Sequence, residues 1–169
     1  MTENDPLSDD TRALAGQVIA LLRDAGQTIA AAESLTGGLL VAALTTVPGA
    51  SYAVRGGIVA YATELKAALL GVDQAMLDVH GAVYPGVAAA MADGARQRLN
   101  ATFGVGTTGV AGPDPQDGQP VGTVHIAVSA DGDTVVRTLA LDGDRDQIRR
   151  LTVEQSLALL LGRLREDIR

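Results

Sequence analysis

Residues 28–46 read TIAAAESLTGGLLVAALTT, an apolar run, a pair of glycines and a second apolar run. The first run, residues 28–32, is short, as strands are, whereas residues 36–46 have the length and pattern of a helix that Pro48 closes. Helically spaced apolar residues over 8–25 precede them. The order helix, strand, helix predicts an α/β domain.

The rest of the chain continues the alternation. The apolar patterns predict strands over 57–60 and 102–105, and helices over 64–70, from Pro85 to Leu99 and over 144–165. Strand-like runs over 121–130 and 134–141 flank Asp131-Gly132-Asp133, a strong signal for an antiparallel hairpin.

These elements predict one three-layer α/β/α domain over residues 1–169. Alternating strands and helices favour a parallel sheet that is covered on both faces, and the hairpin adds an antiparallel edge. We therefore expect a mixed, mostly parallel sheet. Residues 1–7 are expected to form a flexible tail.

The composition argues against several classes of protein. Asp and Glu number 20 against 13 Lys and Arg, giving a net charge of −7, and only 2% of the residues are aromatic. A nucleic-acid binder needs a basic face and stacking side chains, so no nucleic-acid partner is expected. No apolar run approaches the roughly 20 residues that span a bilayer, and the acidic start does not match a secretory signal. We expect a cytoplasmic protein with no membrane partner.

Cysteine and histidine usage narrows the chemistry further. The chain has no cysteine, which excludes disulfides, thiolate metal sites and cysteine nucleophiles. His80 and His125 are far apart in sequence and have no acidic partner at metal-ligand spacing. We therefore expect no metal site and structural histidines.

Glycines gather in three clusters, at 37–38, 56–57 and 104–112. The first follows a strand and opens a helix, so its N–H groups suit an anion such as a phosphate. A plain helix start capped by Ser34 or Thr36 fits the same residues. The third contains a G-x-G-x-x-G spacing, but Pro113 follows where a dinucleotide-binding helix would run, which argues against that site.

Lys66 is the only lysine among 13 basic residues. Lysine can lose its proton when it is desolvated, whereas arginine cannot. A codon preference for arginine would give the same composition, so composition alone leaves the role of Lys66 open. Tyr61 precedes it by five residues, and the two side chains converge only if Tyr61 ends a strand and Lys66 begins the next helix.

Four segments, taken in order, resemble the C-terminal domain family of the competence/damage-inducible protein CinA. They are AESLTGG at 32–38, GGIVAY at 56–61 with Lys66 and LGV at 70–72, TTGVAGP at 107–113, and PVGTV at 120–124. The family includes the nicotinamide-nucleotide amidohydrolases. The likeness covers residues 14–164, nearly the whole chain, and four ordered motifs are far more specific than any one of them.

The resemblance implies an amide hydrolase that converts nicotinamide mononucleotide, a small-molecule nucleotide substrate, to nicotinate mononucleotide and ammonia. No metal and no cofactor are implied. Acyl transfer needs a nucleophile, a base and an oxyanion hole, and a serine–lysine pair is the main combination that this composition leaves. Ser34 and Lys66 match the serine and lysine of the family motifs, and Tyr61 could relay or orient the proton. The expected catalytic residues are Ser34, Tyr61 and Lys66.

Substrate contacts are expected from the glycine-rich turns. The N–H groups around Thr108 and Gly109 are expected to form the oxyanion hole, and Gly37-Gly38 or Arg145 to bind the phosphate. The full expected set is Thr36, Gly37, Gly38, Thr108, Gly109, Ala111, Gly112 and Arg145. Open α/β sheets bind ligands at the carboxyl ends of their strands, so the pocket is expected there.

Three positions depart from the family pattern. Leu35 replaces a frequent cysteine, Tyr84 replaces a small helix-capping serine, and Gln119 replaces a lysine before the Pro-Val-Gly turn. Two alternatives therefore stay open: a module that binds pyridine nucleotides or a partner without catalysis, and an amidohydrolase for a different amide.

We also expect a homo-oligomer. Hydrophobic residues make up 47% of the chain while aromatic anchors are scarce, so aliphatic surface is expected to be buried between subunits. Light scattering at micromolar concentration should show a mass above that of one chain, and a monomer would overturn the expectation.

Overall fold

The computed structural model describes residues 7–167. Its five strands are β1 (Ile29–Glu33), β2 (Val54–Val59), β3 (Phe103–Gly109), β4 (Thr123–Ala130) and β5 (Asp133–Ala140). The helices are α1 (Asp9–Asp24), α2 (Leu39–Thr45), α3 (Thr63–Leu70), α4 (Gln74–His80), α5 (Pro85–Arg98) and α6 (Arg145–Asp167), with a 3-10 turn η1 (Ala50–Tyr52). Of the expected tail, Leu7 is buried against the core and residues 1–6 lie outside the described range.

The sheet is mixed, as predicted, and its strand order is β2-β1-β3-β4-β5. β1 pairs in parallel with β2 and β3, whereas β4 pairs antiparallel with both β3 and β5. The antiparallel part is therefore larger than the predicted hairpin alone. The physical reason is that residues 110–122 return the chain from β3 as a loop, and no helix crosses over to restore the parallel direction.

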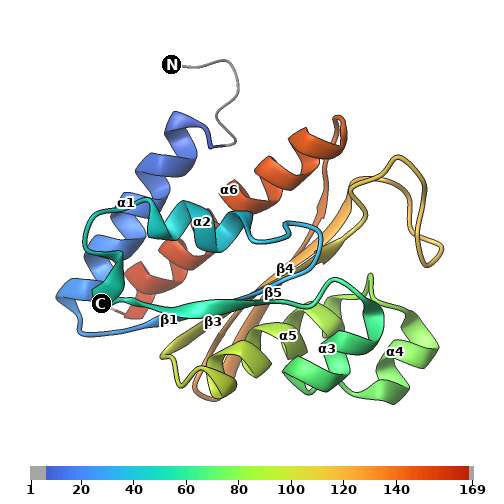
Figure 1. The fold of residues 1–169 in the computed structure, drawn as a ribbon, viewed down its shortest axis with the longest axis horizontal. Helices are drawn as coiled ribbons and strands as arrows, with labels where there is room; N and C mark the ends of the chain where they lie inside the picture. The colour runs from blue at the N-terminus through green and yellow to red at the C-terminus, as the bar shows by residue number, and fades with distance from the viewer. Residues whose placement is uncertain (1–6, 168–169) are drawn as a thin grey trace.

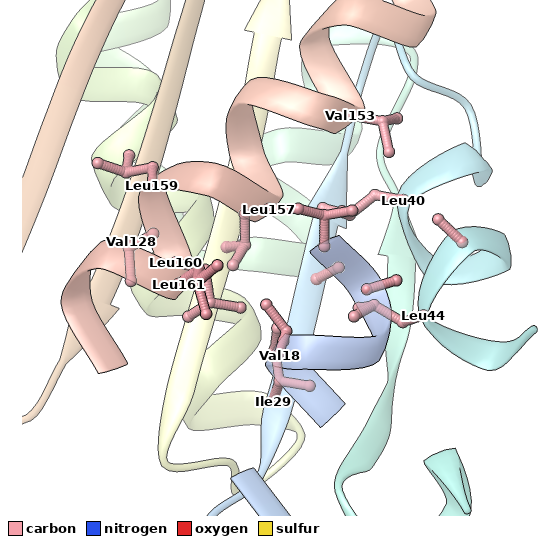
Figure 2. Packing of buried hydrophobic residues seen from close by; sticks show 14 of the residues in the cluster. Val18, Ile29, Leu40, Leu44, Val128, Val153, Leu157, Leu159, Leu160 and Leu161 are labelled. Carbon is pink, nitrogen blue, oxygen red and sulfur yellow. The ribbon is translucent and has the colours of Figure 1, made fainter. Parts of the chain in front are cut away.

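Two helical layers cover the sheet, which confirms the predicted three-layer architecture (Figure 1). α1, α2 and α6 lie on one face and α3, α4 and α5 on the other. Figure 2 shows Val18 of α1 next to Ile29 of β1, with Leu40 of α2 and Leu157 of α6 in the same buried cluster. None of the described helices has both the length and the apolar character needed to cross a membrane.

Helix α5 packs unusually close to β3 because small residues meet there. A Cβ built on Gly104 would lie 1.9 Å from the Ala92 carbonyl oxygen, and one built on Gly106 would lie 2.4 Å from that of Ala88. Backbone therefore contacts backbone with no room for a methyl group. The third glycine cluster thus has a packing role in its first half, since both glycines lie on the strand itself.

Two elements differ from the predictions. The strand predicted over 57–60 is β2, which starts earlier, at Val54. It lies at the sheet edge, where its residues alternate between half-buried and exposed, although an apolar run is typical of a buried strand. Helix α4 was not predicted, because its seven residues provide less than two turns of apolar pattern and bury only Leu77.

The close contact of α5 with β3 can be tested with two matched substitutions. Gly104→Ala should destabilise the protein by about 2–4 kcal/mol because the methyl group has no space. Gly16→Ala, in α1 with nothing within 4 Å of the added Cβ, should stabilise it by about 0.5–1 kcal/mol. Urea unfolding measures both, and equal midpoints for Gly104→Ala and the unmodified protein would contradict the packing argument.

Candidate active site

A pocket of about 120 Å³ opens at the carboxyl ends of β1 and β3, where the sequence predicted it. It is lined by Ser34, Leu35, Tyr61, Ala82, Val83, Thr108, Gly109, Val110, Ala111, Gly112, Asp114, Gln116 and Arg145. The Ser34 loop, the turn at Tyr61 and the loop after β3 thus meet at one place, although they are far apart in sequence.

Ser34 and Lys66 are in direct contact. Ser34 follows β1, Lys66 stands in the first turn of α3, and Lys66 Nζ lies 3.0 Å from Ser34 Oγ. Lys66 is only 1% exposed and Ser34 8%. The predicted pair therefore forms in a site that excludes bulk water from the amine.

Burial lowers the pKa of Lys66 from its usual 10.5 to about 8, even though the carboxylates of Asp117 and Glu64 raise it. A substantial fraction of the amine is thus neutral close to physiological pH. Two carbonyl oxygens accept the other hydrogen bonds of Nζ, that of Ala60 at 2.8 Å and that of Tyr61 at 3.2 Å. In the neutral amine these two carbonyls take the two N–H groups, which leaves the lone pair for the Ser34 hydroxyl proton.

The Glu33 carboxylate caps α2 from the other face of β1. It accepts hydrogen bonds from the N–H groups of Gly38 (3.2 Å), Leu40 (2.9 Å) and Val41 (3.1 Å). The Gly37 N–H donates to the Ser34 carbonyl at 3.1 Å. The anion at this helix start is therefore the protein's own side chain.

This cap corrects the expectation that the first glycine cluster offers free N–H groups to a phosphate. The amides of Gly37 and Gly38 are already used, and neither glycine lines the pocket. Thr36 is fully buried, and its hydroxyl lies 2.9 Å from that of Thr107. The structure thus places these three expected contact residues behind the pocket wall, where they support the Ser34 turn.

Arg149, which the sequence did not single out, holds the same turn from α6. Its guanidinium donates to the carbonyls of Leu35 at 3.0 Å and Thr36 at 3.2 Å. The backbone after Ser34 is therefore held by a carboxylate on one side and a guanidinium on the other. No local signal could reveal this contact, because Arg149 is 114 residues away from Leu35.

Tyr61 and Arg145 meet at the rim of the pocket. Arg145 donates to the Tyr61 hydroxyl at 2.9 Å and to the Gly112 carbonyl at 2.6 Å, so its side chain links two walls. Tyr61 contacts Lys66 through its carbonyl oxygen, while its hydroxyl accepts a hydrogen bond from Arg145 and the residue as a whole is 58% exposed. Its predicted role as a proton relay stays a prediction, whereas a role in holding the amine follows from the contact.

Thr108, Gly109, Ala111 and Gly112 all line the pocket, as expected of contact residues. The Thr108 hydroxyl donates to the Ala82 carbonyl at 2.7 Å and so ties β3 to the segment before α5. Within the described range, no residue accepts a hydrogen bond from the N–H groups of Leu35, Ala111 and Gly112. These three amides are candidate donors for an oxyanion. They differ from the predicted donors, Thr108 and Gly109, which belong to strand β3.

Asp114 and Gln116 were missed as pocket residues. They belong to a loop rich in proline and acidic residues that stays exposed in the structure, so no local signal marks them as pocket residues. Asp114 has no ion-pair partner in the part of the chain that the structure describes.

The histidines stand apart from the pocket lining. His125 is buried on β4 with Nδ1 2.9 Å from the Thr138 hydroxyl, and burial lowers its pKa. His80 stacks on Tyr84, with ring centroids 3.9 Å apart and an angle of 4° between the planes. Tyr84 occupies the N-cap position of α5, and its side chain stacks on His80 without making a capping hydrogen bond. Among residues 7–167 there is no cluster of acidic and histidine side chains that could hold a metal ion.

Of the other two positions that depart from the family pattern, one lines the pocket and the other does not. Leu35 is buried and lines the pocket directly after Ser34. Gln119 does not line the pocket, and its main chain pairs with that of Gln116.

Comparison with known proteins agrees with the resemblance. A family model described as the CinA C-terminal domain matches residues 11–164. A CinA-like protein of Frankia casuarinae is 54% identical over 153 residues, which are 90% of this chain and 35% of that protein. A CinA-like protein of Gloeobacter violaceus is 49% identical over 154 residues, 89% of this chain and 36% of that protein. The chain thus spans little more than a third of the length of these relatives.

Solved structures match over nearly their full length. The competence/damage inducible protein CihA from Agrobacterium tumefaciens has a TM-score of 0.90 and 37% identity, covering 94% of this chain and 98% of that chain. A competence-damaged protein (CinA) superfamily protein from Escherichia coli has a TM-score of 0.87 and 33% identity, covering 92% of each chain. The chain therefore belongs to the CinA C-terminal domain family.

Proposed function

We propose that the chain is an amide hydrolase that converts nicotinamide mononucleotide to nicotinate mononucleotide and ammonia, with Ser34 as the nucleophile and Lys66 as the base. The observation that carries the proposal is the buried 3.0 Å contact between Lys66 Nζ and Ser34 Oγ. A serine hydroxyl is a weak nucleophile until a neighbouring base accepts its proton. The choice of nucleotide comes from the family resemblance.

In the first half of the reaction, neutral Lys66 takes the hydroxyl proton while Ser34 Oγ attacks the carboxamide carbon. The carbonyl oxygen gains a negative charge, and the unpaired N–H groups of Leu35, Ala111 and Gly112 are the donors available to it in the pocket wall. The Lys66 ammonium then gives its proton to the leaving nitrogen. Ammonia departs and an ester on Ser34 remains.

In the second half, water attacks the ester carbon and Lys66 accepts a proton from it. The bond between the carbonyl carbon and Ser34 Oγ breaks, and the proton on Lys66 returns to Oγ. One water is consumed, and the amide becomes an acid and ammonia. The hydrogen bonds that the side chains of Glu33 and Arg149 make with the backbone keep the Ser34 turn in place through both halves.

The charges at the pocket suit a substrate that carries both signs. Arg145 uses two of its N–H groups on Tyr61 and Gly112, which leaves others for a phosphate. Asp114 supplies a carboxylate for a cationic pyridinium ring. Nicotinamide mononucleotide carries both a phosphate and a pyridinium charge, and this match supports it over a neutral amide.

The main alternative is a module that binds pyridine nucleotides without hydrolysis. Calorimetry and an ammonia assay with the same nucleotides separate the two functions. Binding without ammonia from any pyridine nucleotide would favour the module, and ammonia from a different amide alone would correct the substrate.

The serine–lysine mechanism predicts a particular set of variant activities. Ser34→Ala and Lys66→Arg should each lower ammonia release by at least about 1,000-fold, since arginine stays protonated at any working pH. The double variant should be hardly worse than either single variant, because the two groups act as one unit. Near-normal turnover in Lys66→Arg, with nucleotide binding checked by calorimetry, would leave Lys66 as a binding residue only.

The mechanism also predicts the direction of the pH dependence. Only neutral Lys66 can accept the Ser34 proton, so kcat/KM should rise about tenfold per pH unit below the Lys66 pKa of about 8 and level off above it. A stopped assay between pH 6 and pH 10 measures this limb. A profile that is flat across that range would contradict Lys66 as the base.

A further inference from the structure

The loop over residues 110–122 forms one wall of the pocket without being part of the sheet. Asp114 and Gln116, near its middle, line the pocket. The main chains of Gln116 and Gln119 exchange hydrogen bonds of 3.1 Å and 2.8 Å, which closes a tight turn. Asp117 lies inside this turn with a left-handed φ of +51°, a conformation that asparagine and aspartate tolerate better than most residues.

Asp117 fastens this turn to the segment between α4 and α5. Its Oδ2 accepts hydrogen bonds from the N–H groups of Ala82 at 2.7 Å and Val83 at 3.2 Å, two buried residues that line the pocket. The Ala82 carbonyl accepts the Thr108 hydroxyl at 2.7 Å. A continuous chain of contacts therefore runs from the loop through Ala82 to β3.

The contact leaves no space for a side chain at Gly81. A Cβ built on it would lie 2.5 Å from Asp117 Cγ, so any other residue would push the carboxylate away. Its φ of +73° also favours glycine. Two residues with left-handed backbones, 36 positions apart, thus meet to make one docking point.

We propose that Asp117 is a positioning residue that docks the 113–120 loop onto the segment before α5, so that Asp114 and Gln116 complete the pocket wall. The inference is independent of the proposed Ser34–Lys66 chemistry, because it rests on the two hydrogen bonds from Ala82 and Val83. An asparagine at position 117 keeps an oxygen acceptor for both N–H groups.

Hydrogen exchange tests the docking. Asp117→Ala should speed exchange of the Ala82 and Val83 amides at least about tenfold, because the acceptor is gone, whereas Asp117→Asn should change it less than about threefold. Asp114→Asn removes a charge from the same loop without touching these amides, and it should leave their exchange unchanged. Slow exchange of both amides in a folded Asp117→Ala protein would overturn the docking role.

The exchange experiment is independent of the proposed function, because it needs neither nucleotide nor turnover. Absence of ammonia from nicotinamide mononucleotide would overturn the proposed substrate and leave the docking role of Asp117 as inferred.

Discussion

The burial of one lysine amine beside one serine hydroxyl is the constraint that the rest of the site depends on. Moving the pKa of Lys66 from 10.5 to about 8 corresponds to about 3 kcal/mol of folding free energy. This cost applies in full below pH 8, where the native state holds a buried ammonium. It is relieved as the pH rises from 8 to 10.5, where only the unfolded chain still binds the proton. The packing of the three layers must offset this free-energy cost, so the buried Lys66 amine requires a rigid scaffold.

Strand β1 contributes side chains to the helical layers on both faces of the sheet. Successive strand residues point to opposite faces, so Ala31 packs in the cluster of α1, α2 and α6 and Ala32 in that of α3, α4 and α5. Glu33 continues the first row and caps α2, and Ser34 continues the second row and meets Lys66 of α3. The Glu33 carboxylate therefore accepts hydrogen bonds from three amides, and it is not among the groups that raise the pKa of Lys66. Ser34 and the residue that caps α2 are therefore adjacent in sequence but act on opposite faces of the sheet.

The sequence predicted the long elements and the pairing of Ser34 with Lys66 because both leave local marks. Periodicity identified α1, α5 and α6, and a lone lysine in a matching motif identified Lys66. The supports were missed because they depend on tertiary contacts: Arg149 reaches the Ser34 turn across 114 residues. The glycines at 37 and 38 were assigned to a phosphate because an open helix start and an occupied one have the same sequence pattern. The sequence pattern does not show that the side chain of Glu33, at the end of the preceding strand, already occupies this helix start.

The meeting of Ser34 with Lys66 follows from where the chain changes face. After β1 the chain turns to α2 on one face of the sheet, and after β2 it turns to α3 on the other (Figure 1). Ser34 and Tyr61, which follow these two strands, both line the pocket. Ligands bind at such switch points in open α/β sheets. The parallel register pairs Glu33 with Val59, and the Ala60 N–H donates to the Glu33 carbonyl at 2.9 Å, so Ser34 comes level with the carbonyl that holds Lys66 Nζ. A slip of β1 by one residue would send Ser34 to the α2 face and Glu33 toward the amine. The register of β1 within the sheet therefore decides which side chain the lysine meets.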